Sequence, residues 1–89
     1  MAQFELGRLL ATPGVLDAAG DEDLMVYLSR HARGDWGVVD DADKRANDRA
    51  LKDGTRLLSA YVLRDGTTRV WVITEADRSA TTILLPSEY

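Results

Sequence analysis

The chain has 89 residues, of which 45% are hydrophobic and 29% charged, a composition typical of one small globular domain and too apolar for a disordered chain. Fifteen Asp and Glu residues oppose eleven Lys and Arg, and this acidic balance argues against direct binding to nucleic acid. The absence of cysteine excludes disulfides and thiolate catalysis. No apolar run reaches the ~18 residues of a membrane span and no signal-peptide pattern opens the sequence, so we expect a cytoplasmic protein without membrane contact.

The first segments of the chain carry the signals of a short helix. Residues 4–11 fit either a strand or an irregular lead-in. Thr12 followed by Pro13 is typical of an N-cap and the first helical position, and Gly20 is a typical helix stop.

A second helix is predicted to follow directly and to end at Gly34. Asp21 is its expected N-cap, and Glu22 and Asp23 fall in the first turn, where the helix dipole favours acidic side chains. One face of this helix is expected to be buried, because apolar residues and the single histidine recur at helical spacing: Leu24, Tyr27, Leu28 and His31.

A third helix is expected from a cap at Asp40 or Asp41 to a stop at Gly54. One side of this helix carries pairs of opposite charge four residues apart, which predicts a solvated face. Its inner side is expected to consist of small apolar residues: Ala42, Ala46, Ala50 and Leu51.

After Gly54 the pattern changes to that of strands. Residues 55–64 and 68–74 are rich in β-prone residues, and the Asp65-Gly66 pair between them is a strong hairpin signal. A polar loop then leads to a third strand over residues 80–85. The order predicts a single α+β domain over residues 1–89: two or three short helices packed on a three-stranded antiparallel sheet, with the N-terminal segment as a candidate fourth strand. The expected core comprises Leu24, Leu28, Trp36, Leu51, Leu58, Tyr61, Val70, Val72, Ile83 and Leu85.

The negative charge is concentrated in the helical half of the chain. Residues 17–43 hold eight acidic side chains against Arg30 and Arg33, whereas the segments 1–16 and 54–89 are neutral. A surface rich in carboxylates can occupy the basic groove of a nucleic-acid-binding protein. The competing interpretation is helix capping, which would occupy Asp21 and Asp40. The remaining candidates for partner binding in this segment are Glu22, Asp23, Asp41 and Asp43.

His31 and the loop 75–79 are the other candidates for chemistry. His31 lies on an apolar stripe, so a core histidine bonded to backbone is favoured over a metal ligand or a base, and neither a metal nor another cofactor is expected. In the loop, Glu75, Asp77 and Arg78 could bind a partner or polar ligand. The structural interpretation makes Asp77 an Asx-turn residue and Arg78 an intramolecular clamp. Ser79 has only His31 as a candidate base, and nothing in the sequence places them together.

Several stretches together resemble a widespread family of short bacterial, plasmid and phage proteins of unknown function. They are residues 30–37 (RHARGDWG), 47–51 (NDRAL), 57–61 (LLSAY) and 73–89 (ITEADRSATTILLPSEY). The resemblance covers nearly the whole chain and implies no catalytic residues. The mobile-element setting of such relatives implies an anti-defence or host-interaction role.

These observations lead to one functional hypothesis and two alternatives. The leading one is a non-enzymatic protein whose acidic surface binds a basic, nucleic-acid-handling protein, as a phage or plasmid inhibitor of the anti-CRISPR or antirestriction kind. One alternative is a host interaction or regulatory module. The other is a small hydrolase or ligand-binding enzyme that uses His31, Glu75, Asp77 and Arg78. Self-association as a homodimer is open, with Trp71 as a candidate interface residue because it alternates with Val70 and Val72.

Overall fold

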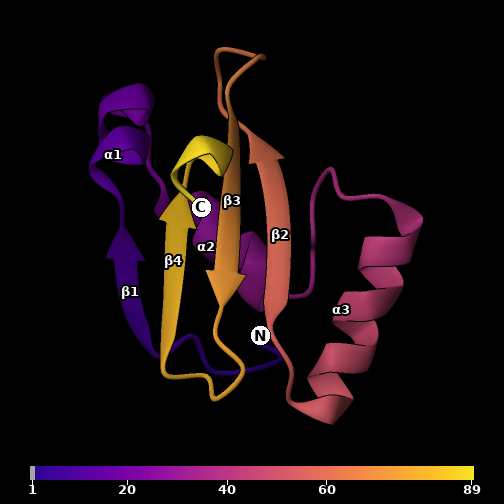
Figure 1. Cartoon of the computed structure of the whole chain (residues 1–89). Coiled ribbons are helices and arrows are strands. Elements are labelled where there is room, and N and C mark those ends of the chain that lie inside the picture. The colour runs from indigo at the N-terminus through magenta and orange to yellow at the C-terminus, as the bar shows by residue number, and fades with distance from the viewer. Residues whose placement is uncertain (1) are drawn as a thin grey trace.

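Four strands form one sheet in the order β1-β4-β3-β2, seen face-on in Figure 1. The structure is a computed structural model that describes residues 2–89. In chain order the elements are β1 (Arg8–Ala11), α1 (Pro13–Ala19), α2 (Met25–Ala32), α3 (Asp41–Asp53), β2 (Leu57–Val62), β3 (Arg69–Thr74), β4 (Ala80–Leu84) and a 3-10 helix (Pro86–Glu88). The predicted α+β fold is confirmed, with the N-terminal segment supplying the fourth strand.

The direction of β1 corrects the expectation of an antiparallel sheet. The β2–β3 and β3–β4 pairs are antiparallel, as the meander predicts, but β1 pairs parallel with β4, so the sheet is mixed. Because β1 and β4 lie at opposite ends of the sequence, no turn signal fixes their relative direction. The pairing places Leu9 opposite Thr81 and Ala11 opposite Ile83.

Helix ends follow the capping signals in two helices of three. The Thr12 side chain accepts from the Val15 amide (3.3 Å), and Asp40 accepts from the Asp43 amide (2.8 Å). Gly54 ends α3 in the left-handed conformation that favours glycine. The second helix starts later than predicted.

Asp21 was the wrong choice for the N-cap of α2. Leu24 occupies that position, and Asp23 accepts from the Met25 amide (3.0 Å). The Asp21 carboxylate instead forms an ion pair with Arg64, far away in sequence, which no local capping rule could indicate.

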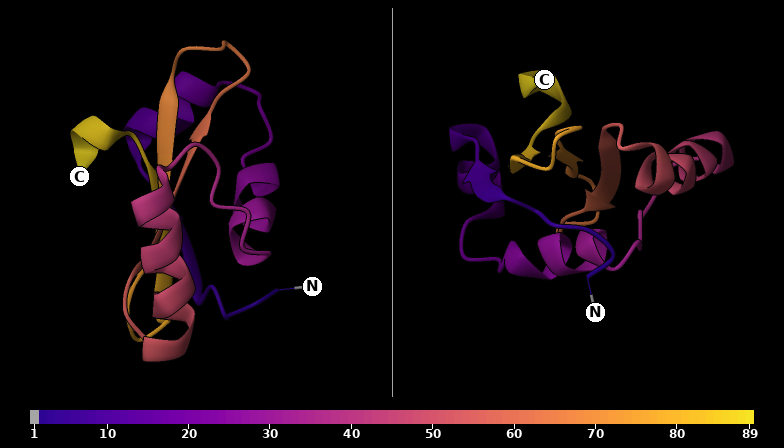
Figure 2. Two further views of the ribbon diagram at one scale, coloured as in Figure 1. Left: turned by 90° about the vertical axis from the view of Figure 1, so that its right-hand side faces the viewer. Right: turned by 90° about the horizontal axis from the view of Figure 1, so that it is seen from below.

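The main core lies between α2 and one face of the sheet, and Figure 2 shows α2 across that face with the 3-10 helix on the other. Its buried residues are Val15, Tyr27, Leu28, Tyr61, Leu63, Val70, Val72 and Ile83. Of the predicted core, Leu24, Leu51, Leu58 and Leu85 are only half-buried. Leu57 packs against Trp36 and Ser59 contacts His31 of α2, and Leu58 between them points to the other, less covered face of the sheet.

A second apolar cluster fixes α3 and the preceding turn beside β2. It contains Trp36, Ala50 and Leu57, all buried. Gly37 has a φ of 76° and lies so close to β2 that a Cβ there would be 2.0 Å from the Ala60 oxygen, so only glycine fits. Trp36, an expected core residue, is 5% exposed, which confirms its predicted burial.

The expected inner side of α3 is partly wrong. Ala42 and Ala46 are exposed, and the helix contacts the sheet through Asn47, Ala50 and Leu51 instead. The buried side of α3 differs from the predicted one because a polar residue, Asn47, occupies its central position.

Candidate functional site

The eight acidic side chains of residues 17–43 fall into two groups. Asp35 forms an ion pair with Arg30 (2.7 Å), and Arg64 lies near Asp21 (3.2 Å) and Glu22 (3.7 Å). The other five are exposed and have no ion pair within residues 2–89; we call them the unpaired acidic set: Asp17, Asp23, Asp40, Asp41 and Asp43. The set contains three of the four predicted partner-binding residues of this segment.

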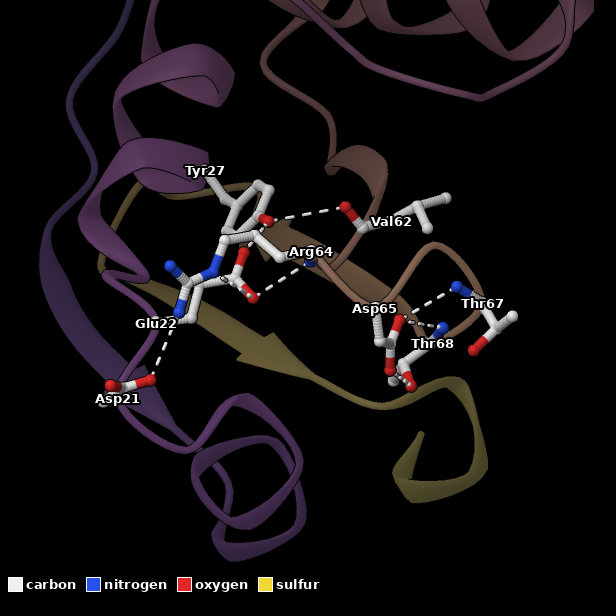
Figure 3. Close-up of polar contacts among 8 residues, drawn as sticks. All are labelled: Asp21, Glu22, Tyr27, Val62, Arg64, Asp65, Thr67 and Thr68. Atoms are coloured by element: carbon white, nitrogen blue, oxygen red, sulfur yellow. Dashed lines mark hydrogen bonds and ion pairs between the residues drawn. The ribbon is translucent and has the colours of Figure 1, made fainter.

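Glu22, the fourth, lies in a different environment (Figure 3). Its side chain is only 11% exposed, and its carboxylate accepts from the Tyr27 hydroxyl and from the Arg64 amide (3.0 Å). Burial, and then the Glu22 hydrogen bond, raise the pKa of Tyr27 to about 12. Glu22 therefore fastens the loop before α2 to the end of β2 and has few free acceptor positions for a partner.

The hairpin beside this contact is held by Asp65 (Figure 3). Its carboxylate accepts from the amides of Thr67 (2.9 Å) and Thr68 (2.8 Å) and from the Thr68 hydroxyl. These bonds, the Thr68 hydroxyl first, lower the pKa of Asp65 to about 2. The predicted Asp65-Gly66 turn is confirmed, with Gly66 at a φ of 77°.

The remaining predicted acidic residues lie at the starts of two helices. Asp23 precedes α2, while Asp41 and Asp43 are in the first turn of α3. Carboxylates at these positions stabilise the helix ends through the dipole. The exposed carboxylates of the predicted set therefore belong to the starts of two different helices.

The loop 75–79 forms the turn that was expected if Asp77 and Arg78 have structural roles. Asp77 accepts from the Ser79 amide (3.0 Å), the Asx turn that was predicted, and the Ser79 hydrogen bonds lower the pKa of Asp77. Arg78 has a φ of 62°, rare for a residue with a side chain. Glu75 and Asp77 remain exposed, and whether they contact a partner stays a prediction.

Arg78 is the predicted intramolecular clamp. Its guanidinium donates to four backbone oxygens, those of Thr55 (2.7 Å), Ala50 (3.0 Å), Glu75 (3.2 Å) and Ala76 (3.3 Å). Since Ala50 is in the last turn of α3, the cation also lies where the helix dipole favours positive charge. Arg78 thus joins the β3–β4 turn to the end of α3.

His31 is buried, as predicted, but its partners are hydroxyls rather than backbone. Nδ1 is 2.5 Å from Ser59 Oγ, and Nε2 is 2.9 Å from Thr74 Oγ1. Thr74 in turn contacts Thr81 (2.7 Å), which donates to the Leu6 carbonyl (2.7 Å). Burial, with a smaller contribution from Arg78, lowers the pKa of His31 to about 4.

In this arrangement the imidazole and its two hydroxyl partners are enclosed in the core. The hydroxyl beside the imidazole belongs to Ser59, which is fully buried, whereas Ser79 is on an exposed turn. Both nitrogens of His31 are hydrogen-bonded inside the core, and no hydrogen bond links His31 to Glu75 or Asp77 within residues 2–89. Within the same residues no group of three or more histidine or acidic side chains could hold a metal ion.

Comparisons of the chain with protein-family models, curated proteins and solved structures found no match. None of the helices in residues 2–89 is long and apolar enough to cross a membrane.

Two features of interest escaped the sequence reasoning. Arg64 is the basic partner of Asp21 and Glu22, a pairing for which the sequence holds no local signal. The second feature is the exposure of Leu9 and Leu10 on an edge strand. Two adjacent leucines direct side chains to both faces of a strand, which was the sequence signal for this surface.

Proposed function

We propose that this chain is a binding protein whose exposed carboxylates engage a basic protein that handles nucleic acid. The observation that supports the proposal most directly is the unpaired acidic set. Arginines near the acidic segment pair with Asp21, Glu22 and Asp35, which leaves Asp23, Asp41 and Asp43 free to face a partner.

The physical argument depends on several charges acting together. A single exposed ion pair contributes only about 0–1 kcal/mol, so one carboxylate cannot hold a partner. Several carboxylates attract a basic surface over the ~8 Å screening length at physiological ionic strength and accelerate association. Two acidic parts at two helix starts suit a partner groove that presents basic residues along a nucleic-acid path.

The biological role that we propose is inhibition of a defence system, of the anti-CRISPR or antirestriction kind. This step rests on the resemblance to short plasmid and phage proteins, whose setting favours such a role. The hydrolase alternative would require His31 to reach the exposed Glu75 and Asp77, whereas its imidazole is bonded to Ser59 and Thr74 in the core.

The test neutralises the acidic surface without removing helix caps. Asparagine keeps the capping oxygen of aspartate, so the variant Asp23→Asn/Asp41→Asn/Asp43→Asn should fold with a charge more positive by three. A matched control removes three carboxylates elsewhere: Glu5→Gln, Asp48→Asn and Asp53→Asn.

Each protein is expressed in cells that carry a CRISPR or a restriction system, and the transfer of a targeted plasmid is counted. We expect the parent and the control to restore transfer and the triple asparagine variant to lose this effect. Equal protection by all three would refute the acidic surface, and no protection by the parent would refute the anti-defence role.

A further inference from the structure

The two edges of the sheet differ in how their outward backbone groups are satisfied. On β2, Asn47 bonds both the N–H (3.1 Å) and the C=O (2.7 Å) of Leu58. The Ala60 N–H donates to Trp36 (3.1 Å), and its C=O accepts from Val38 (2.7 Å). With α3 beside it, the β2 edge is closed (Figure 1).

The β1 edge has no such cover. Arg8 and Thr12 donate their N–H groups to the β4 side (2.9 and 3.1 Å). Since alternate residues of a strand direct their backbone groups to the same side, Leu9 and Ala11 direct theirs away from the sheet. No element lies beyond β1 in Figure 1. An edge of this kind is a template for another strand.

Exposed apolar side chains gather at the same edge. Leu9 is 44% exposed, Leu10 40% and Met25 51%. Leu9 shares the sheet face of Ile83 toward α2, whereas Leu10 points to the opposite face. A groove between β1 and α2 is lined mainly by Leu9, Leu10, Ala11, Leu24, Met25 and Leu28. Both faces of the strand therefore present apolar surface to solvent.

We propose that two copies of the chain pair antiparallel through β1, about a two-fold axis that passes at Leu10. Leu9 of each copy then exchanges two backbone hydrogen bonds with Ala11 of the other copy. The outward N–H and C=O groups of both residues are therefore satisfied. The two four-stranded sheets become one continuous sheet. Such a contact is isologous and closes on itself.

Charge complementarity favours a second copy in this register. Arg8 lies opposite Thr12 of the other copy, and the Thr12 hydroxyl donates to the Glu88 carboxylate (2.6 Å). Arg8, Leu10 and Thr12 alternate onto the same face, so Arg8 of each copy approaches the Glu88 carboxylate of the other, and the contact occurs twice in the dimer. A register centred on Leu9 would instead place Arg8 against Leu10. The proposal does not depend on any defence system, and of the acidic set only Asp23 lines the groove beside β1 within the described residues.

Cysteine cross-linking tests the register, because the chain has no cysteine of its own. In the proposed dimer, the two copies of residue 10 are a directly opposite pair about 4.5 Å apart at Cα, whereas the two copies of residue 9 are offset by two positions. Under mild oxidation, Leu10→Cys should form a covalent dimer, and Leu9→Cys, which is equally exposed, should remain a monomer on a denaturing gel.

Sedimentation tests the surface itself. The parent should sediment with twice the mass of the chain, and Leu10→Lys should raise the dimer dissociation constant at least about 100-fold, because two lysines would face each other in place of two buried leucines. Leu16→Lys, at an exposed α1 position, is the matched control and should leave the dimer intact. Circular dichroism confirms that each variant is folded.

Three results would overturn the proposal: a parent that is monomeric at every concentration, a dimer cross-linked by Leu9→Cys instead of Leu10→Cys, or a dimer that Leu10→Lys leaves unchanged. A monomeric parent would mean that the β1 edge is available to a strand of another protein. Cross-linking through residue 9 would move the two-fold axis. A dimer unaffected by Leu10→Lys would place the interface on a different surface, such as the face of Trp71.

Discussion

His31 is the centre of a buried chain of polar side chains that spans three strands. Ser59, Thr74 and Thr81 occupy neighbouring positions on β2, β3 and β4, and all three face α2. Every buried side-chain nitrogen and oxygen within residues 2–89 has a hydrogen-bond partner, so this polar chain is fully satisfied. The hydrogen bonds from the imidazole to Ser59 and Thr74 therefore fix the orientation of α2 on the sheet, in addition to the apolar packing.

This burial predicts that stability falls as the solution becomes mildly acidic. The pKa of His31 is about 4 in the folded chain and near 6.5 when unfolded, so the unfolded state takes up the proton first. The free energy of unfolding should be nearly constant above pH 7, and should fall by about 2 kcal/mol by pH 5 and by about 3 kcal/mol by pH 4. Urea unfolding at a series of pH values measures this loss of unfolding free energy.

A variant without the titrating group supplies the control. His31→Gln should be less stable than the parent at pH 7 but nearly flat between pH 7 and 5, since the chain contains no other histidine. If the parent and the variant lose the same free energy over this range, the histidine is not the group responsible.

At the scale of elements, α3 lies beside the β2 edge of the sheet and contacts it along one side. Asn47, Ala50 and Leu51 contact the rest of the domain from its inner side, and Arg78 bonds the end of the helix. The Asp48 carboxylate of the same helix accepts from the Trp36 indole (3.3 Å). The other side of α3 is solvated, and the predicted pairs four residues apart form no ion pair in the described part of the chain. The amide of Asn47 therefore matters more for this helix than its surface charges.

Asn47→Ala should destabilise the domain by about 2–3 kcal/mol, because the N–H and C=O of Leu58 lose their partner at a largely buried position. Hydrogen exchange should show the Leu58 amide exchanging faster than in the parent. Arg45→Ala on the exposed side is the control and should change stability by less than about 0.5 kcal/mol. Equal effects of the two substitutions would show that the Asn47 bonds do not hold α3.

The features predicted correctly from the sequence are those set by a few neighbouring residues. Thr12 with Pro13, Asp40, Gly54 and the Asp65-Gly66 turn each act over one turn of chain, so their residue types suffice. The roles of Asp77 and Arg78 within their own loop were accessible for the same reason.

What was missed depends on contacts distant in sequence. The parallel direction of β1, the Asp21–Arg64 ion pair and the hydroxyl partners of His31 each join residues that no local pattern connects. The composition of residues 17–43 indicated an acidic surface, but only the fold divides it into the internal Glu22 and the exposed Asp23, Asp41 and Asp43.

At the scale of the whole molecule, the sheet has two unlike faces. Val70 and Val72 are fully buried under α2, and Trp71 between them lies on the opposite face, half-buried. Figure 2 shows only the 3-10 helix Pro86–Glu88 and the chain end against that second face. Tyr89 lies edge-on to Trp71 at 5.6 Å between ring centres and accepts a hydrogen bond from Arg56.

We therefore predict that Tyr89 shields Trp71. Tyr89→Ala should increase the quenching of tryptophan fluorescence by iodide, because Trp36 is 5% exposed and contributes little to quenching. Tyr89→Phe keeps the ring and should behave almost like the parent. The newly exposed aromatic surface should also bind a hydrophobic dye more strongly in the alanine variant. Unchanged quenching in Tyr89→Ala would mean that the 3-10 helix alone covers Trp71 and that the tyrosine ring is free of the sheet.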